Sequence, residues 1–118
     1  MLAVIPSSFY GVNRMGMDMY IDRIRRNPND KKDILERKEL CYWRKFWGLH
    51  NELGLYGPED YGNDVPMTKA DVERAIDFAT RNEDYWGDFN SVPQLCEVLR
   101  DYDVYKLDGW DIVYNANW

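Results

Sequence analysis

The chain has 118 residues, a length typical of one compact domain, and its 15 basic and 21 acidic side chains give a formal net charge of −6. Hydrophobic residues make up 45% of the sequence and aromatic residues 15%, which is enough to bury a core and excludes a disordered acidic tail. No apolar run approaches the roughly 20 residues that a membrane-spanning helix needs. The acidic balance disfavours direct binding of nucleic acid.

The charge is distributed unevenly along the chain. Residues 1–50 carry ten basic and six acidic side chains, a net of +4. Residues 51–118 carry five basic and fifteen acidic side chains, a net of −10. This asymmetry favours a binding protein with two different faces over a uniform mimic of DNA.

The first predicted element is a strand. We expect residues 1–118 to form one domain, with 1–14 as an irregular leader arm that packs against it. Apolar and polar residues then alternate from Met17 to Asp22, which is typical of a half-buried strand whose polar face carries Asp18, Tyr20 and Asp22. Asn-Pro-Asn-Asp at residues 27–30 predicts a turn.

The longest helical periodicity covers residues 33–54. Asp33 is a suitable N-cap and Gly54 a natural C-terminal stop, so the pattern predicts one long helix. On a helical wheel, Arg44, Trp47 and Asn51 fall on one side of that helix.

The rest of the chain predicts a loop, two helices and a hairpin. The loop spans residues 55–67, and a capping box at Thr68–Asp71 begins a helix that ends near Arg81. Another helix starts at Ser91, with Pro93 in its first turn. Residues 104–107 and 110–114 flank Asp-Gly, a strong signal for a two-residue β-hairpin. The sequence therefore predicts an α+β fold, in which the N-terminal strand and C-terminal hairpin form a small antiparallel sheet covered by about three helices.

Three segments of the chain resemble small uncharacterised phage and prophage proteins. Those proteins begin Met-Gly-Leu-Asp-Met-Tyr-Leu, and this chain has Met-Gly-Met-Asp-Met-Tyr-Ile at residues 15–21. They continue Glu-x-x-Tyr-Trp-Arg-Lys-x-x-x-Ile-His, matched here by residues 39–45 and by Leu49-His50. Many close on an aromatic strand, as does this chain at 110–118. The family's Gly-Phe-Phe-Phe-Gly segment is not visible, and residues 83–92 hold a shorter replacement. The resemblance implies a phage setting and a shared fold, and implies no reaction.

Two groups of residues are candidates for binding. The segment around residues 42–51 combines aromatic rings with polar ends, which suits a nucleotide-like ligand or, alternatively, a buried core. Its candidate ligand-binding residues are Tyr42, Arg44, Lys45, Trp47, His50 and Asn51. In the acidic second half, carboxylates alternate with aromatic residues, which suits docking onto a basic protein or, alternatively, a solvated surface. Its candidate protein-binding residues are Glu59, Asp60, Tyr61, Glu83, Asp84, Tyr85, Trp86 and Asp88.

No catalytic motif is found, and we expect neither a metal nor a cofactor. The single histidine, His50, is interpreted as a neutral, hydrogen-bonded core residue, with a catalytic base beside Asp18 or Glu39 as the alternative. The carboxylates of Asp18 and Asp22 are expected to pair with Arg44 or Lys45, with a catalytic carboxylate pair as the alternative. Cys41 and Cys96 are interpreted as reduced thiols.

Together these observations favour a non-enzymatic, counter-defence phage protein. We expect it to act in the cytoplasm of the bacterial host as an inhibitor, neutralising a host protein such as an immune effector through its acidic aromatic surface. One alternative is sequestration of a small nucleotide-like signal in a pocket lined by the helix predicted over residues 42–51. A second alternative is a small hydrolase that uses His50 with a carboxylate. Self-association through an exposed sheet edge or the 1–14 arm stays open.

Overall fold

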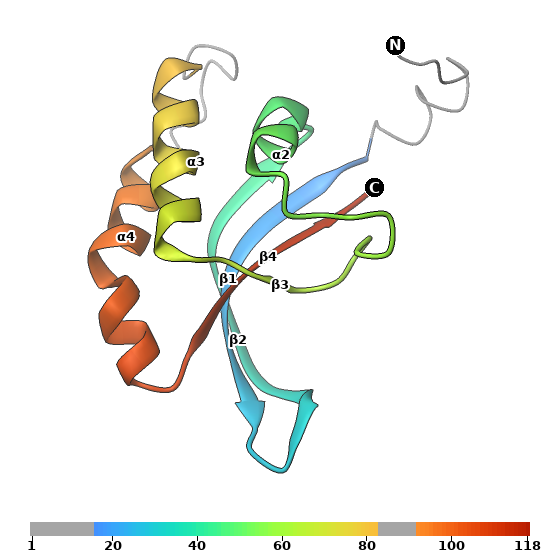
Figure 1. The fold of residues 1–118 in the computed structure, drawn as a ribbon, viewed down its shortest axis with the longest axis vertical. Helices are drawn as coiled ribbons and strands as arrows, with labels where there is room; N and C mark the ends of the chain where they lie inside the picture. The colour runs from blue at the N-terminus through green and yellow to red at the C-terminus, as the bar shows by residue number, and fades with distance from the viewer. Residues whose placement is uncertain (1–15, 83–91) are drawn as a thin grey trace.

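The computed structural model describes residues 16–82 and 92–118, which build an antiparallel sheet with helices on one side (Figure 1). In chain order the elements are β1 (Asp18–Asn27), β2 (Asp30–Arg44), α2 (Trp47–Leu53), β3 (Val65–Pro66), α3 (Lys69–Arg81), α4 (Val92–Leu107) and β4 (Asp111–Asn117). Within the described residues the strands lie in the order β2-β1-β4-β3, and every neighbouring pair is antiparallel. The predicted α+β class, with a small antiparallel sheet and helices over it, is confirmed.

The strand β1 forms the centre of the sheet and the predicted strand at 17–22 is confirmed, although it continues to Asn27. Its partner β2 follows through the tight turn predicted at residues 27–30. In that turn the Asn27 side chain accepts a hydrogen bond from the backbone N–H of Asn29 at 2.9 Å, and Asp30 accepts one from Lys32 at 3.1 Å. These local bonds fix the reversal of the chain.

The long helix predicted over residues 33–54 is wrong for most of its length. Residues 30–44 are the strand β2, and only Trp47–Leu53 are helical. At the end of β2, Cys41 and Trp43 are buried while Tyr42 and Arg44 face the other side, which is the period of a strand. Pairing with β1 along the whole strand overrides the helix propensity of the Leu-Glu-Arg-Lys-Glu-Leu segment.

The helix α3 confirms its predicted start and end. The Thr68 side chain accepts a hydrogen bond from the Asp71 backbone N–H at 3.1 Å, and the Asp71 carboxylate accepts one from the Thr68 N–H at 2.8 Å. This reciprocal pair satisfies two backbone donors that a helix otherwise leaves free. The following helix, α4, has Pro93 in its first turn as predicted, while the predicted cap at Ser91 lies outside the described residues.

The predicted C-terminal hairpin is wrong in its first arm. Residues 104–107 belong to α4, and only the second arm is a strand, β4. Gly109 has a φ of +85° and ends the helix: its N–H donates to the Lys106 carbonyl at 3.1 Å, and the Trp110 N–H donates to the Tyr105 carbonyl at 2.9 Å. This pair of bonds is a Schellman motif. Glycine after aspartate suits both a hairpin turn and a helix end, because both need a positive φ.

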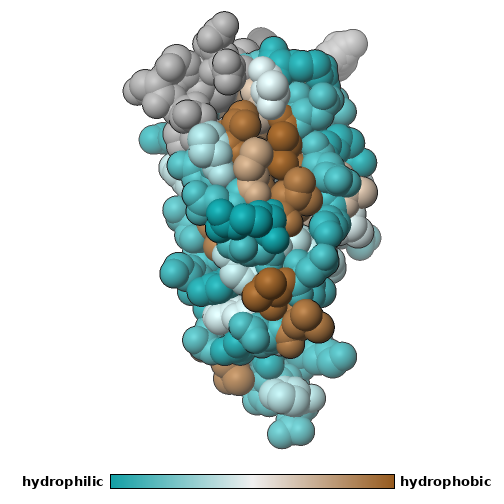
Figure 2. Space-filling model, turned by 90° about the vertical axis from the view of Figure 1, so that its left-hand side faces the viewer, coloured by the Kyte–Doolittle hydropathy of each residue, from teal (hydrophilic) through white to brown (hydrophobic). Residues whose placement is uncertain are grey.

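The main core lies between the sheet and the three described helices. Buried side chains reach it from β1, β2 and β4 on one side and from α2, α3 and α4 on the other, among them Ile21, Trp43, Tyr114, Leu49, Val72 and Leu95. Figure 2 shows the side of the molecule where α3 and α4 lie, with hydrophobic residues in patches that hydrophilic residues separate and flank. Among the described residues, none of the helices combines the length and the hydrophobicity that spanning a bilayer requires.

Candidate functional site

The sheet face opposite the helices is rich in polar side chains. Side chains alternate along β1, so Met19 and Ile21 enter the core while Asp18, Tyr20 and Asp22 occupy the other face. We call this second side the open face. Strand pairing adds Glu39 from β2 and Asn115 from β4 to it, because they lie opposite Asp22 and Tyr20 respectively.

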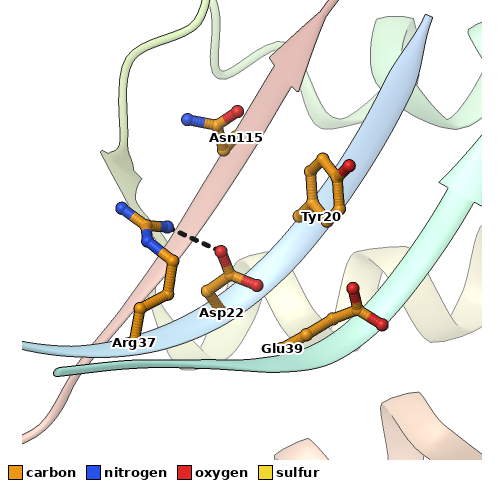
Figure 3. A pocket seen from close by; sticks show the side chains of 5 residues that line it. All are labelled: Tyr20, Asp22, Arg37, Glu39 and Asn115. Carbon is orange, nitrogen blue, oxygen red and sulfur yellow. Dashed lines mark hydrogen bonds and ion pairs between the residues drawn. The ribbon is translucent and has the colours of Figure 1, made fainter.

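A pocket of about 380 Å³ lies on the open face. It is lined by Tyr20, Asp22, Arg37, Glu39 and Asn115, which come from three adjacent strands. Figure 3 shows Arg37 and Asn115 on one side of the Asp22 carboxylate, and Tyr20 and Glu39 on the other. Residues that are far apart in sequence thus converge around one buried carboxylate.

Arg37 is held in place by two aspartates. Its Nη1 donates to Asp22 Oδ2 at 2.6 Å, and its Nη1 and Nη2 donate to the two oxygens of Asp64 at 3.1 and 2.6 Å. The Asn115 amide also donates to Asp64, at 3.1 Å. The bidentate bond to Asp64 is the main reason that the pKa of Arg37 is raised. The arginine is therefore a fixed part of the site with little capacity for another anion.

Asp22 is the unusual group of the pocket. It is only 4% exposed, and its Oδ1 is a buried oxygen with no hydrogen-bond partner among the described residues. Burial raises the pKa of Asp22, and this effect outweighs the bond to Arg37. We take the Arg37 charge as stabilised chiefly by Asp64, with Asp22 as the weaker, partly unsatisfied partner. An unpaired buried oxygen of this kind costs free energy, which makes Asp22 a candidate functional group of the pocket.

Two tyrosines extend the site along the open face. The rings of Tyr20 and Tyr42 are 5.2 Å apart, and the Tyr42 hydroxyl donates to Asp18 Oδ1 at 2.6 Å. That bond raises the pKa of Tyr42 to about 12. The pKa of Tyr20 is raised by burial and then by the charges of Asp18, Glu39 and Asp22, which reflects the negative potential of the pocket.

The structure divides the six predicted ligand-binding residues between the two sides of the sheet. Tyr42 and Arg44 are on the open face of β2, and Lys45 is the junction before α2, with a φ of 61°. Trp47, His50 and Asn51 are on α2, on the helix side. The single helical stripe of Arg44, Trp47 and Asn51 is therefore wrong, because Arg44 belongs to a strand. A role of these six residues in ligand binding stays a prediction.

His50 belongs to an aromatic cluster on the helix side of the sheet. Its Nδ1 lies 2.7 Å from the hydroxyl of the buried Tyr114, and burial lowers the pKa of the imidazole. The rings of Trp47, Tyr56 and Trp118 surround it at centroid distances of 5.4–5.7 Å. The sheet separates His50 from Asp18 and Glu39, so the structure does not bring together the histidine and either carboxylate of the alternative catalytic interpretation.

The expected ion pairs of the first strand are also wrong. Asp22 pairs with Arg37, and Asp18 accepts its hydrogen bond from Tyr42, so neither bonds to Arg44 or Lys45 among the described residues. Arg37 was not among the predicted site residues, and Glu39 was named only as an alternative partner of His50, because their segment was predicted to be helical. The alternation of Asp18, Tyr20 and Asp22 was the signal that pointed to a polar sheet face.

The predicted protein-binding residues fall in two segments. Glu59, Asp60 and Tyr61 lie in the loop before β3, where Glu59 and Tyr61 are exposed. Asp60 accepts a hydrogen bond from the Gly57 N–H at 2.7 Å, and the Tyr61 ring is 4.8 Å from that of Trp118. The second segment, with Glu83, Asp84, Tyr85, Trp86 and Asp88, lies outside the described residues.

Neither metal-binding nor disulfide chemistry is seen in the part of the chain that the structure describes. No group of three or more His, Cys, Asp or Glu side chains there is arranged to hold a metal ion. Cys41 is buried and Cys96 is exposed, both as free thiols.

Comparisons with known proteins identify no relative of this chain. The chain matches no protein-family model, and comparisons with curated proteins and with solved structures give no significant match. The site is therefore interpreted from its own geometry.

Proposed function

We propose that this protein acts by binding a partner protein through the open face of its sheet. The observation that carries the proposal is the buried Asp22 carboxylate, which has one unpartnered oxygen and lines a pocket on that face. A partner group that donates a hydrogen bond there replaces an unsatisfied polar atom with a satisfied one, which favours the complex. The adjacent tyrosines supply the aromatic area typical of binding hot spots.

The charges around the pocket favour a basic partner. Asp22, Asp64 and Glu39 are three carboxylates against the one guanidinium of Arg37, so the site carries a surplus of negative charge. Such a surface steers a positively charged protein towards it and disfavours phosphate-bearing ligands. We therefore propose the open face as the docking surface. The loop at Glu59–Tyr61, which the sequence suggested for this role, is the alternative that the experiment tests.

The arrangement of His50 favours binding over hydrolysis. Its hydrogen bond to Tyr114 and its aromatic surroundings lie on the helix side, away from the carboxylates of the open face. A general base needs an orienting group and a substrate position within hydrogen-bond reach.

For the biological role, we propose a phage protein that neutralises a component of its bacterial host. The similarity of residues 15–21 and 39–51 to small phage and prophage proteins supports this setting, which would place the protein in the host cytoplasm. An immune effector that binds nucleic acid is the kind of host protein whose basic surface suits the open face.

The experiment compares capture of bacterial proteins by three forms of the tagged full-length chain. The first is the wild type, the second carries Asp22→Asn and Glu39→Gln, and the third carries Glu59→Gln and Asp60→Asn. Each variant removes two carboxylates, so the two differ in location but not in formal charge. Bound proteins from bacteria that express defence systems are quantified by mass spectrometry, and circular dichroism verifies that each variant is folded.

We expect a specific host protein to bind the wild type and the loop variant and to be lost from the open-face variant. Capture lost only from the loop variant would assign docking to Glu59 and Asp60 and overturn the proposal. Equal capture by all three forms would also overturn it, because binding would then depend on neither acidic surface.

A further inference from the structure

We infer that the pocket on the open face is a receptor for the guanidinium group of an arginine side chain on the partner protein. This inference rests on the proposed function and names the group that the site recognises. It follows from three features of the described residues: unused acceptors, an adjacent aromatic ring, and an internal example of the same interaction.

The unused acceptors belong to Asp22 and Glu39. Asp22 Oδ1 has no partner, and no hydrogen bond or ion pair engages the Glu39 carboxylate within the described residues. The two residues are cross-strand partners, which places their Cβ atoms about 5 Å apart. In Figure 3 the free oxygen of Asp22 is directed towards the side of the pocket that Tyr20 and Glu39 occupy. A group entering there meets two carboxylates, while Arg37 already donates to Asp22 and Asp64, and the Asn115 amide donates to Asp64 and to the Gly62 carbonyl.

The Tyr20 ring makes this side of the pocket suited to a planar cation. It stands next to both carboxylates in Figure 3, and Tyr42 packs against it on the same face. A guanidinium is planar, presents five N–H donors and stacks on aromatic rings, so it can donate to both carboxylates while lying over the tyrosine. An ammonium has one compact charge that is strongly hydrated, and it gains less from the ring.

Arg37 provides the internal example. Its guanidinium already joins two carboxylates on this face, Asp22 and Asp64, at 2.6 Å from each. The fold also stacks guanidinium groups on an aromatic ring: those of Arg23 and Arg25 lie 4.4 and 4.2 Å from the ring centre of Trp110. A second guanidinium between Asp22 and Glu39 therefore repeats contacts that this fold already makes.

The test is a nuclear magnetic resonance titration of the isotope-labelled full-length protein. The probes are N-acetylarginine amide, N-acetyllysine amide and N-acetylcitrulline amide. Citrulline matches arginine in shape and lacks its charge, so it serves as the neutral control. We expect the arginine probe to cause saturable shifts at Tyr20, Asp22 and Glu39, the lysine probe to bind more weakly, and the citrulline probe to cause none.

Three single variants locate the interaction. Asp22→Asn and Glu39→Gln should each weaken binding of the arginine probe about tenfold, which is the loss expected for one charge-assisted contact. Asp77→Asn removes the same charge on α3, where Asp77 pairs with Arg81, and should leave the affinity unchanged. Because Glu39 is exposed, Glu39→Gln is expected to fold, and it tests the site even if Asp22→Asn does not fold.

Each contrary result has a defined meaning. Equal shifts with citrulline, tighter binding of the lysine probe, absence of saturable shifts, or unchanged affinity in Glu39→Gln would overturn the assignment of an arginine site. Binding of the arginine probe without any effect of the open-face variant on host-protein capture would leave the arginine site standing and overturn the proposed function. If the open-face variant loses capture of the host protein but the wild type does not bind the arginine probe, the proposed function stands and the arginine site is overturned.

Discussion

Arg37 on β2 donates a 2.6 Å hydrogen bond to the carboxylate of Asp22 on β1. That carboxylate belongs to a residue that is almost fully buried. Replacing Arg37 with alanine leaves that buried charge uncompensated. We expect the free energy of unfolding to fall by about 2 kcal/mol, less than for a fully buried pair because the Arg37 side chain is 39% exposed. Urea denaturation at pH 7 measures the change. Arg81→Ala breaks the exposed pair with Asp77 and should cost about 0.5 kcal/mol or less. Equal losses in the two variants would contradict the prediction.

Asp22 also gives stability a defined pH dependence. Its pKa is higher in the folded protein than the ordinary value of 3.8, because burial disfavours the charged form. The folded state therefore binds this proton more tightly. The contribution of Asp22 to stability is fully present below pH 3.8 and is lost as the pH rises through the folded pKa. Denaturation across this range should show the unfolding free energy of the wild type falling relative to that of Asp22→Asn. A relative increase with pH would contradict the assignment.

His50 should titrate below its ordinary pKa of 6.5, because it is desolvated within the aromatic cluster. Stability from the neutral imidazole is then present above pH 6.5 and is lost as the pH falls through the lowered pKa. Because the chain has one histidine, its ring signal in a proton NMR titration is unambiguous. Tyr114→Phe should leave the pKa below 6.5, since burial rather than the hydroxyl causes the shift. A measured pKa of 6.5 or higher would contradict the burial of the His50 side chain in the aromatic cluster.

Two threonines of one region allow a matched test of the capping box. Thr68→Ala removes the side-chain acceptor for the Asp71 N–H and should lower the free energy of unfolding by about 1 kcal/mol. Thr80→Ala removes a hydroxyl that donates to the Ile76 carbonyl inside α3, and should be neutral or slightly stabilising because alanine favours the helix. Urea denaturation of both variants measures the difference. A larger loss at Thr80 would refute the role of the cap.

Val104 tests the revised assignment of the C-terminal region. It lies in α4 and is 58% exposed, so Val104→Ala should leave stability unchanged or raise it by a few tenths of a kcal/mol. In the hairpin strand predicted from the sequence, the same change would be destabilising. Val113→Ala in β4 is the matched control: Val113 is fully buried, and the loss should be about 2 kcal/mol. Thermal denaturation compares the stability of the two variants. A clear loss of stability in Val104→Ala would support the predicted hairpin strand over the helix α4.

The sequence alone determined the elements whose signals are local. The alternation at residues 17–22 is a property of one strand, and the capping box at Thr68–Asp71 is a bond between residues three apart. The turn at residues 27–30 also depends on its own side chains. The α+β class follows from the strand and from the helix that the capping box begins, because each has an apolar side that another element must cover.

Only the tertiary structure decided the segments whose local preference fits two states. Residues 30–44 have a good helix composition, yet they pair with β1, because backbone hydrogen bonds and the burial of Cys41 and Trp43 together outweigh propensity. Asp108-Gly109 suits a turn or a helix end, and the length of α4 selects the second. The open-face site depends on the same choice. Asp22, Arg37 and Glu39 meet only because β2 lies beside β1, and the register of that pairing is set by long-range contacts that a local pattern does not contain.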